Sequence, residues 1–366
     1  MSSTKGSNKG PKKTKRQRIK SKKKAETLDE DEMPAKDPIL DPAFVSVRKT
    51  AEWFCKIQST VGLGEFYTKN LKSFNPTPFL FPSFTANKNK NRNQNIVCLE
   101  ESRVKLQHED KTKSDYIHAN YVKFEGLDRP YIMTQHPLEN TIEDFWRMVF
   151  YEEVLNIIAI INPTDPKTPP YWPMEAGKYT NHGAFFVHCK SVVEGKGQYT
   201  ANAYTIEVLP EGCSNSHIVT LLNYPNWAKS SVPGHPLVVL KMIRMTKNET
   251  KPQAPIVVHC EHGINRAGIV VLANAITTLA FSMTEPDMPG LFKKIRSQRA
   301  TIVSHKYAYI YACYVFLYYI RKRCKIHKKN LDLVNDIDNF ESSVKKELEL
   351  VKSAENKEKE GAVTVD

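Results

Sequence analysis

The sequence predicts an α/β domain with a basic tail before it and an amphipathic helix after it. Residues 255–258 are a short apolar run rich in β-branched side chains, as in a buried strand, and residues 268–279 have the composition of a buried helix. Between residues 44 and 57 the apolar side chains recur three and four positions apart, which predicts an N-terminal helix that residues 66–71 extend. A strand that leads directly into a buried helix is typical of α/β folds.

The first 25 residues form a separate segment by charge. They hold eleven Lys and Arg residues and no Asp or Glu, so without them the formal charge of +13 falls to +2. Because Ile19 is their one bulky apolar side chain, they cannot bury a core, and we expect disorder. Residues 9–24 would suit a nuclear import receptor or a polyanion such as nucleic acid or anionic lipid; the alternative is a solvated arm.

The chain is expected to hold one large domain between two tails. Residues 1–40 are predicted to be the disordered tail, basic and then acidic, and residues 41–327 the domain. Residues 328–366 are predicted to form a charged amphipathic helix that ends in a frayed tail and docks on the domain or on a partner. The apolar positions of this helix are Leu333, Ile337, Phe340, Val344, Leu348 and Val351.

The sequence also favours one kind of compartment. Residues 307–320 are the most apolar run, shorter than the roughly 20 residues that span a bilayer, so we expect a buried helix and no membrane span. No apolar core follows the charged start, as a secretory signal would require, and the seven cysteines are scattered. His259 and His262 would suit zinc only with a second pair of ligands, which the sequence lacks. We therefore expect an intracellular protein of the cytoplasm or nucleus, without metal or cofactor, and the oligomeric state stays open.

The most informative motif is His259, Cys260, Gly263 and Arg266, with the spacing H-C-x-x-G-x-x-R. A loop between a strand and a helix N-terminus directs several backbone N–H groups at one point, which makes an anion site. Gly263 permits loop conformations that other residues avoid, and the Arg266 fork matches two phosphate oxygens. The same positive surroundings would favour a nucleophilic thiolate at Cys260. The expected binding loop is Glu261, His262, Gly263, Ile264, Asn265 and Arg266.

This motif resembles that of the protein tyrosine phosphatases, and the resemblance extends from about Asp41 to Cys324. Lys90-Asn-Arg92 is similar to the start of the family's substrate-recognition loop. The resemblance implies a twisted mixed sheet, mostly parallel and flanked by helices, with Cys260 at its C-terminal edge. Further stretches that match the family are residues 115–121 (DYIHANY), 131–138 (YIMTQHPL), 144–149 (DFWRMV) and 171–173 (YWP).

The chain departs from the family at the general acid. The family supplies an Asp from a mobile Trp-Pro-Asp loop, whereas residues 223–227 read Asn-Tyr-Pro-Asn-Trp and put Asn226 at the acid position. An amide gives up no proton at neutral pH, and general acid catalysis is worth about 10²–10⁴ in rate, or roughly 3–5.5 kcal/mol of barrier. No Asp or Glu lies between Cys213 and Glu249, so a shifted alignment supplies no other acid.

Three further supports of the family site are altered. Ala267 stands where the family has a hydroxyl after the arginine, and Ser304 stands at the position of the water-orienting glutamine, with His305 beside it as a partial substitute. Asn93 replaces the recognition tyrosine, and Asn95 replaces the nearby Asp. Loss of the aromatic wall removes contact worth roughly 0.5–1.5 kcal/mol.

These observations favour one function and leave two alternatives. The retained Cys260 and Arg266 predict that phosphate binding survives, and the losses predict weak or absent turnover, so the chain would bind or trap phosphotyrosine proteins. The first alternative is an active phosphatase with a displaced acid, for which His262, Glu261 and His235 are the candidates. The second is a nuclear or nucleic-acid-associated protein that acts through its basic tail.

An altered site on a complete scaffold also resembles the phosphatases of bracoviruses, the polydnaviruses of parasitoid wasps, in which some members are active and others are not. This resemblance implies delivery into insect host cells. There the protein would suppress immune-cell adhesion, phagocytosis or signalling.

Overall fold

The computed structural model describes residues 44–361, apart from residues 109–111, 128, 197–200, 230, 247–250, 252 and 283–286, with side chains as far as residue 350. The chain divides into a unit of residues 1–35 and a unit of residues 36–366, and all of the described residues belong to the second unit. The tail predicted over residues 1–40 lies outside the described residues.

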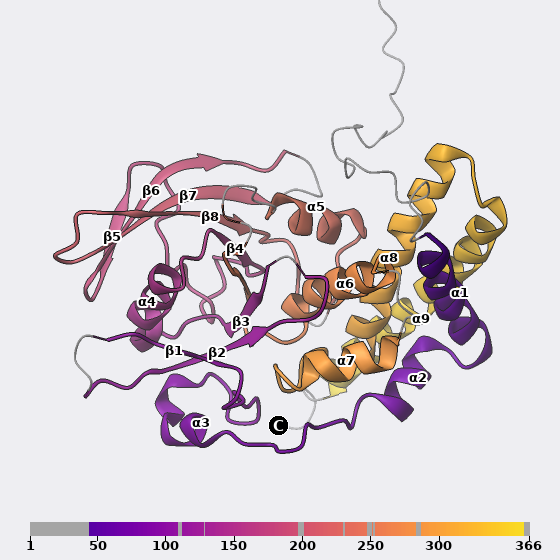
Figure 1. Ribbon diagram of the computed structural model, residues 1–366, viewed down its shortest axis with the longest axis horizontal. Coiled ribbons are helices and arrows are strands. Elements are labelled where there is room, and N and C mark those ends of the chain that lie inside the picture. Colours follow the sequence, from indigo (N-terminus) through magenta and orange to yellow (C-terminus); the bar gives the residue numbers. More distant parts are fainter. Residues whose placement is uncertain are drawn as a thin grey trace, which may run out of the picture. The chain divides into compact units, whose positions relative to one another are not determined.

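A twisted sheet of nine strands forms the centre of the described part of this unit, in the order β1-β2-β3-β9-β4-β8-β7-β6-β5 (Figure 1). The predicted mixed α/β fold is therefore confirmed. The strands are β1 Arg103–Lys105, β2 Tyr116–Val122, β3 Tyr131–Gln135, β4 Asn156–Ala159, β5 Tyr179–His182, β6 Phe185–Val193, β7 Asn202–Pro210, β8 His217–Asn223 and β9 Ile256–Cys260.

The parallel part of the sheet is confined to its middle. Strands β3, β9, β4 and β8 pair in parallel, whereas β1 and β2 on one side and β7, β6 and β5 on the other are antiparallel. The expectation of a mostly parallel sheet is therefore wrong. At both edges of the sheet, strands that follow one another in the sequence pair with each other, and such direct neighbours are antiparallel, since a parallel pair needs a long crossover.

Helices cover both faces of the sheet, with α4 on one face and most of the others on the opposite face (Figure 1). The N-terminal helix predicted over residues 44–57 is confirmed as α1. The helices are α1 Phe44–Thr60, α2 Leu63–Asn70, α3 Pro82–Ala86, η2 Lys88–Lys90, η3 Glu139–Thr141, α4 Ile142–Tyr151, α5 Leu237–Met245, α6 Arg266–Ala280, α7 Met288–Arg296, α8 Lys306–His327 and α9 Leu331–Gly361.

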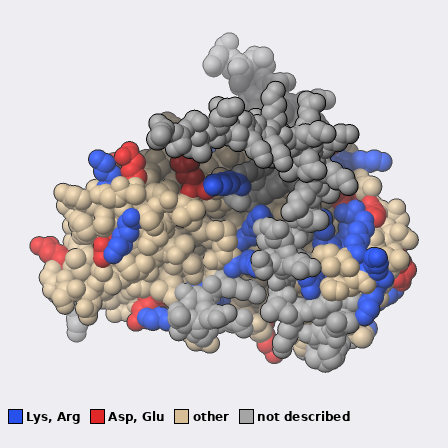
Figure 2. All heavy atoms as spheres, turned by 90° about the horizontal axis from the view of Figure 1, so that it is seen from above, with Lys and Arg blue, Asp and Glu red and all other residues tan. Residues whose placement is uncertain are grey.

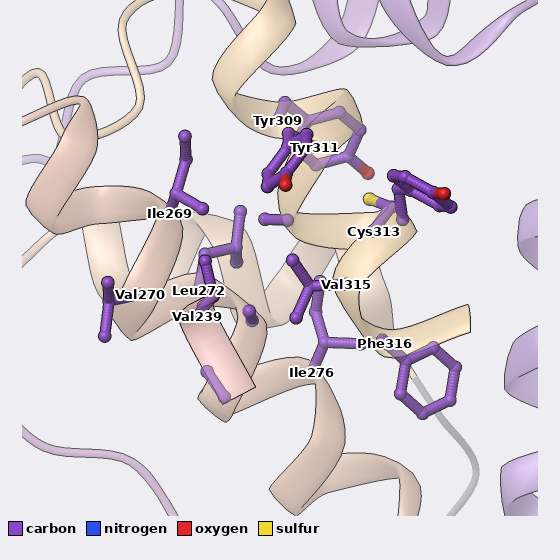
Figure 3. Packing of buried hydrophobic residues seen from close by; sticks show 14 of the residues in the cluster. Val239, Ile269, Val270, Leu272, Ile276, Tyr309, Tyr311, Cys313, Val315 and Phe316 are labelled. Carbon is purple, nitrogen blue, oxygen red and sulfur yellow. The ribbon is translucent and has the colours of Figure 1, made fainter. Parts of the chain in front are cut away.

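The larger core lies between the sheet and helices α5, α6 and α8. In Figure 3, Val239 of α5, Ile269 and Ile276 of α6, and Val315 and Phe316 of α8 lie together in this core. Helix α8 is buried along most of its length, as the sequence predicted for residues 307–320. Because α6 begins at the motif and is packed on several sides, the core fixes the position of the motif's helix.

The C-terminal helix α9 docks on the domain. Its apolar positions Leu333, Ile337, Phe340 and Val344 are buried against α1 and α8. Of the two expectations for this helix, docking back is confirmed. No helix in the described part of the chain is long and apolar enough to cross a membrane.

Charged side chains of both signs are interspersed on the face of the molecule shown in Figure 2, with Lys and Arg more frequent on its right-hand side. The formal charge of the whole chain is +13, and the first 25 residues carry eleven of these positive charges. The remaining residues therefore have a net charge of only +2, which agrees with the mixture of signs on this face.

Candidate active site

The motif lies at the C-terminal edge of the parallel strands. Strand β9 ends at Cys260 and α6 begins at Arg266, so residues 261–265 form a loop at the N-terminus of a long buried helix. Strands β3 and β4 flank β9, and Gln135 pairs with Cys260. A helix N-terminus favours anions because its first N–H groups lack partners within the helix. The expected anion site is thus formed where open α/β sheets bind ligands.

Close packing against the end of β3 fixes the shape of this loop. Gly263 has φ +65°, and a Cβ added there would lie 2.0 Å from the carbonyl oxygen of Thr134. The N–H of His136 donates to the carbonyl oxygens of Cys260 and Glu261, at 3.0 and 3.1 Å. The loop therefore needs glycine at position 263 for its backbone conformation and for the space available.

A buried arginine braces the loop from below. Arg299 is fully buried, and its guanidinium donates to the carbonyl oxygens of His262 (3.2 Å) and Gly263 (3.3 Å). Its Nη1 also donates to Asn120 Oδ1 (2.8 Å) and lies 3.2 Å from His118 Nδ1. Burial, and then the Arg299 charge, lowers the pKa of His118 to about 3, so the imidazole is neutral and accepts from the guanidinium. The sequence did not identify Arg299, because nothing local distinguishes it from a surface arginine.

The histidine before the nucleophile is held by a tyrosine. The Tyr171 hydroxyl lies 2.7 Å from His259 Nε2, and both side chains are buried. Burial holds the pKa of His259 well below its usual value and raises that of Tyr171, so the pair is neutral. The hydrogen bond between these two neutral groups holds the imidazole in place behind Cys260.

A cavity of about 450 Å³ opens above the loop. Cys260 is 4% exposed and lines it, together with most of the binding loop that the sequence predicted. The lining residues are Asn93, Ile96, Lys229, Cys260, Glu261, His262, Ile264, Asn265, Arg266, Thr301, Ser304, His305 and Tyr307.

The loop that carries the altered acid position meets the cavity through a lysine. Asn226 is exposed and does not line the cavity, whereas Lys229 does. Lys229 Nζ lies 2.5 Å from Glu261 Oε2 and 3.8 Å from Asp165 Oδ2. Arg266 Nη1 donates to the Trp227 carbonyl oxygen at 2.9 Å, which ties this loop to the motif's arginine. The sequence reasoning missed Lys229, because the family pattern directs attention to position 226.

The altered glutamine position belongs to a small polar network. Asn265 Oδ1 accepts from the Ser304 N–H (2.9 Å) and hydroxyl (3.1 Å). Asn265 Nδ2 then lies 2.8 Å from His305 Nδ1. The structure therefore brings Ser304 and Asn265 together beside Cys260, and His305 joins them at the rim of the cavity.

The recognition loop contributes one of its two altered positions. Asn93 lines the cavity, while Asn95 is exposed, does not line it, and donates its backbone N–H to Asn93 Oδ1 at 2.8 Å. Arg92 anchors this loop by donating to the carbonyl oxygens of His136, Lys167 and Pro137, at 2.7 to 3.0 Å.

The three candidate displaced acids lie in different surroundings. His262 lines the cavity, but burial, helped by nearby cations, lowers its pKa and leaves little of the proton-donating form at neutral pH. Glu261 forms the ion pair with Lys229. His235 lies by another hollow, where its Nδ1 accepts from the Leu237 N–H and its ring packs 4.9 Å from that of Tyr318. Among the described residues, no group of three His, Cys, Asp or Glu side chains could hold a metal ion.

Comparison with known proteins agrees with this geometry. The family model described as protein-tyrosine phosphatase matches residues 87–318. The chain belongs to the protein-tyrosine phosphatase family. It is 34% identical over 240 residues to the receptor-type tyrosine-protein phosphatase zeta of Rattus norvegicus. The matched region covers 62% of this chain and 10% of that protein. It is 30% identical over 237 residues to the tyrosine-protein phosphatase 99A of Drosophila melanogaster. Here the matched region covers 62% of this chain and 18% of that protein.

A third relative matches a longer part of the chain. The receptor-type tyrosine-protein phosphatase eta of Gallus gallus is 26% identical over 299 residues, which is 80% of this chain and 21% of that protein. The chain thus spans about a tenth to a fifth of the length of these relatives. The shared part is the phosphatase domain, which supports a tyrosine phosphatase-like function for the cavity at Cys260.

Proposed function

We propose that this chain binds phosphotyrosine-bearing proteins in the Cys260 cavity and releases their phosphate slowly. The observation that carries the proposal is the lining of the cavity. Among the described residues, Glu261 is the one carboxylate that lines it, and Lys229 lies against that carboxylate at 2.5 Å. That ion pair holds the carboxylate against the lysine, and no second carboxylate among the described residues lines the cavity to serve as the proton donor.

Binding and turnover depend on different groups. Binding needs the loop, the α6 N-terminus and the Arg266 fork, all of which the chain retains. Expulsion of a tyrosine phenolate, whose pKa is about 10, needs a proton donor that Asn226 does not supply. Slow turnover would leave a phosphotyrosine partner bound for longer, as a trapping protein requires.

The test is to measure binding and turnover of one phosphotyrosine peptide by the same protein. We expect the wild type and Cys260→Ser to bind it with similar affinity, and Arg266→Met to lose binding about 10²-fold because the bidentate contact is gone. Steady-state release of phosphate by the wild type should exceed that of Cys260→Ser only slightly. Asn226→Asp should raise it, if residue 226 turns inward when phosphate is bound. Wild-type turnover more than about 10²-fold above Cys260→Ser would contradict impaired catalysis.

The basic tail calls for a separate experiment. Its eleven cations in 25 residues support a nuclear import receptor or a polyanion as its partner. Deletion of residues 1–25 should move a fluorescent fusion out of the nucleus, and unchanged localisation would contradict that role. The bracoviral origin and the suppression of host immune cells stay predictions of the resemblance. Expression of wild type and Cys260→Ser in insect blood cells, with phagocytosis as the readout, tests the second.

A further inference from the structure

The departing oxygen of a substrate would meet the loop at residues 226–229. Trp227 is 1% exposed, its indole N–H donates to the Ser231 carbonyl oxygen at 2.9 Å, and its own carbonyl oxygen accepts from Arg266. These contacts hold the backbone beside the motif's arginine. The side chain that this loop presents to the cavity is Lys229.

The charges around the cavity nearly balance, and Lys229 is the cation that the loop of residues 226–229 places there. Arg266 and Lys229 line it, and Arg92 is close enough to lower the pKa of His262. Two carboxylates oppose them: Glu261 at 2.5 Å from Lys229 and Asp165 at 3.8 Å. Lys229 is thus already paired, and a second phosphate group next to the one held by Arg266 would take the place of Glu261 as its anionic partner.

The missing acid has a different consequence for such a substrate. The phenol of tyrosine has a pKa of about 10, whereas the second ionisation of a phosphate group has a pKa of about 6. A phosphate therefore departs as an anion without a proton donor, and a cation stabilises the charge that develops on it. Asn93 offers an amide instead of an aromatic ring at the wall, so the cavity has lost a surface for stacking a tyrosyl ring.

We propose that Lys229 acts in place of the general acid and suits this cavity to phosphoanhydrides, that is, to inorganic or nucleotide polyphosphates. The proposal rests on the phosphate binding proposed above. The Cys260 thiolate attacks the terminal phosphorus, the S–P bond forms, and the P–O bond to the bridging oxygen breaks. The electron pair stays on the departing phosphate, whose charge Lys229 stabilises. The oxygen of a water molecule then bonds to phosphorus as the S–P bond breaks and its electron pair returns to sulfur, which restores the thiolate. One water proton stays on the orthophosphate that forms, and the other passes to the solvent or to the departed phosphate.

The test compares leaving groups in full-length protein with EDTA present, so that contaminating metal ions contribute nothing. The substrates are tripolyphosphate, whose leaving group is an anion of low basicity, and phenyl phosphate, whose leaving group is a basic phenolate. We expect the wild type to hydrolyse tripolyphosphate well above Cys260→Ser, and phenyl phosphate barely above it. Lys229→Gln should lower kcat/KM for tripolyphosphate by about 10²-fold, as for loss of a charge-stabilising donor, and Lys229→Arg should restore part of it.

A matched control uses a second lysine that pairs with a glutamate far from the cavity. Lys251 Nζ lies 3.0 Å from Glu153 Oε2, so Lys251→Gln removes a similar pair and should change neither rate. Equal losses on both substrates in Lys229→Gln, or tripolyphosphate rates no higher than those of Cys260→Ser, would overturn the proposal. Vanadate binding by the wild type separates the outcomes. If vanadate binds and tripolyphosphate is not cleaved, only this inference fails. If vanadate does not bind, the phosphate site of the proposed function fails as well.

Discussion

Replacement of Gly263 by alanine tests whether the loop depends on its close approach to β3. Alanine at φ +65° costs about 1–2 kcal/mol relative to glycine, because its Cβ crowds the backbone. The Cβ would also lie 2.0 Å from the Thr134 carbonyl oxygen and 3.1 Å from Arg299 Nη2, so the loop must move by about 1 Å to restore contact distances. A misplacement of that size costs about 10²-fold in a site that depends on alignment.

We therefore expect Gly263→Ala to lower the free energy of unfolding by more than the conformational cost alone, about 2–4 kcal/mol, and to weaken vanadate binding about 10²-fold. Urea unfolding and isothermal calorimetry measure the two effects. Gly177→Ala is the matched control, because Gly177 has φ +81° with nothing within 4 Å of the added Cβ. It should lose about 1–2 kcal/mol and bind vanadate normally. Equal stability losses in the two variants, or normal vanadate binding by Gly263→Ala, would refute the reasoning.

Three more predictions concern the scaffold. Burial lowers the pKa of His118 and of His136 to about 3, so below pH 6.5 the unfolded chain binds more protons and stability falls, until the folded state also protonates near pH 3. Urea unfolding at pH 6.5 and pH 5 should differ by about 1.6 kcal/mol for each histidine, and an equal stability would contradict their burial as neutral groups. Tyr171→Phe leaves the buried His259 Nε2 without its partner at 2.7 Å and should cost about 1–3 kcal/mol in the same assay, whereas no loss would mean that another group takes over. Phe340→Ala should cost about 3 kcal/mol because the ring is buried where α9 docks, and a change below about 0.5 kcal/mol would contradict that packing.

The sequence was informative wherever the structure depends on near neighbours. The apolar strand, the glycine and the arginine of the motif lie within twelve residues, so their order alone defines a strand, a turn and a helix start. The buried α8 could be predicted for the same reason, because one run of apolar side chains determines it. The docking of α9 could not, because an amphipathic stripe shows that a helix has a partner and does not identify it.

The site residues that could not be predicted from the sequence are those placed by contacts between distant segments. Arg299 reaches the motif from more than thirty residues away, and Lys229 meets Glu261 beside the Trp227 carbonyl group that Arg266 holds. Position 226 was identified from the family pattern, yet its side chain is exposed, since the turn that carries it directs Lys229 to the cavity instead.

The segment behind the loop supports it with strained backbone. Thr301 and Val303 have φ of +56° and +52°, a conformation that costs a β-branched residue roughly 1–2 kcal/mol. The strain has a local use, because the Val303 N–H donates to the Ile264 carbonyl oxygen at 3.0 Å and the Tyr67 hydroxyl donates to the Val303 carbonyl oxygen at 2.7 Å. Strained backbone of this kind persists where the surroundings enforce it, often at ligand sites. Asn93 and Ser304 line the cavity and Asn226 lies outside it, while the strained brace supports the loop itself, which is the arrangement expected if the loop binds phosphate as proposed above.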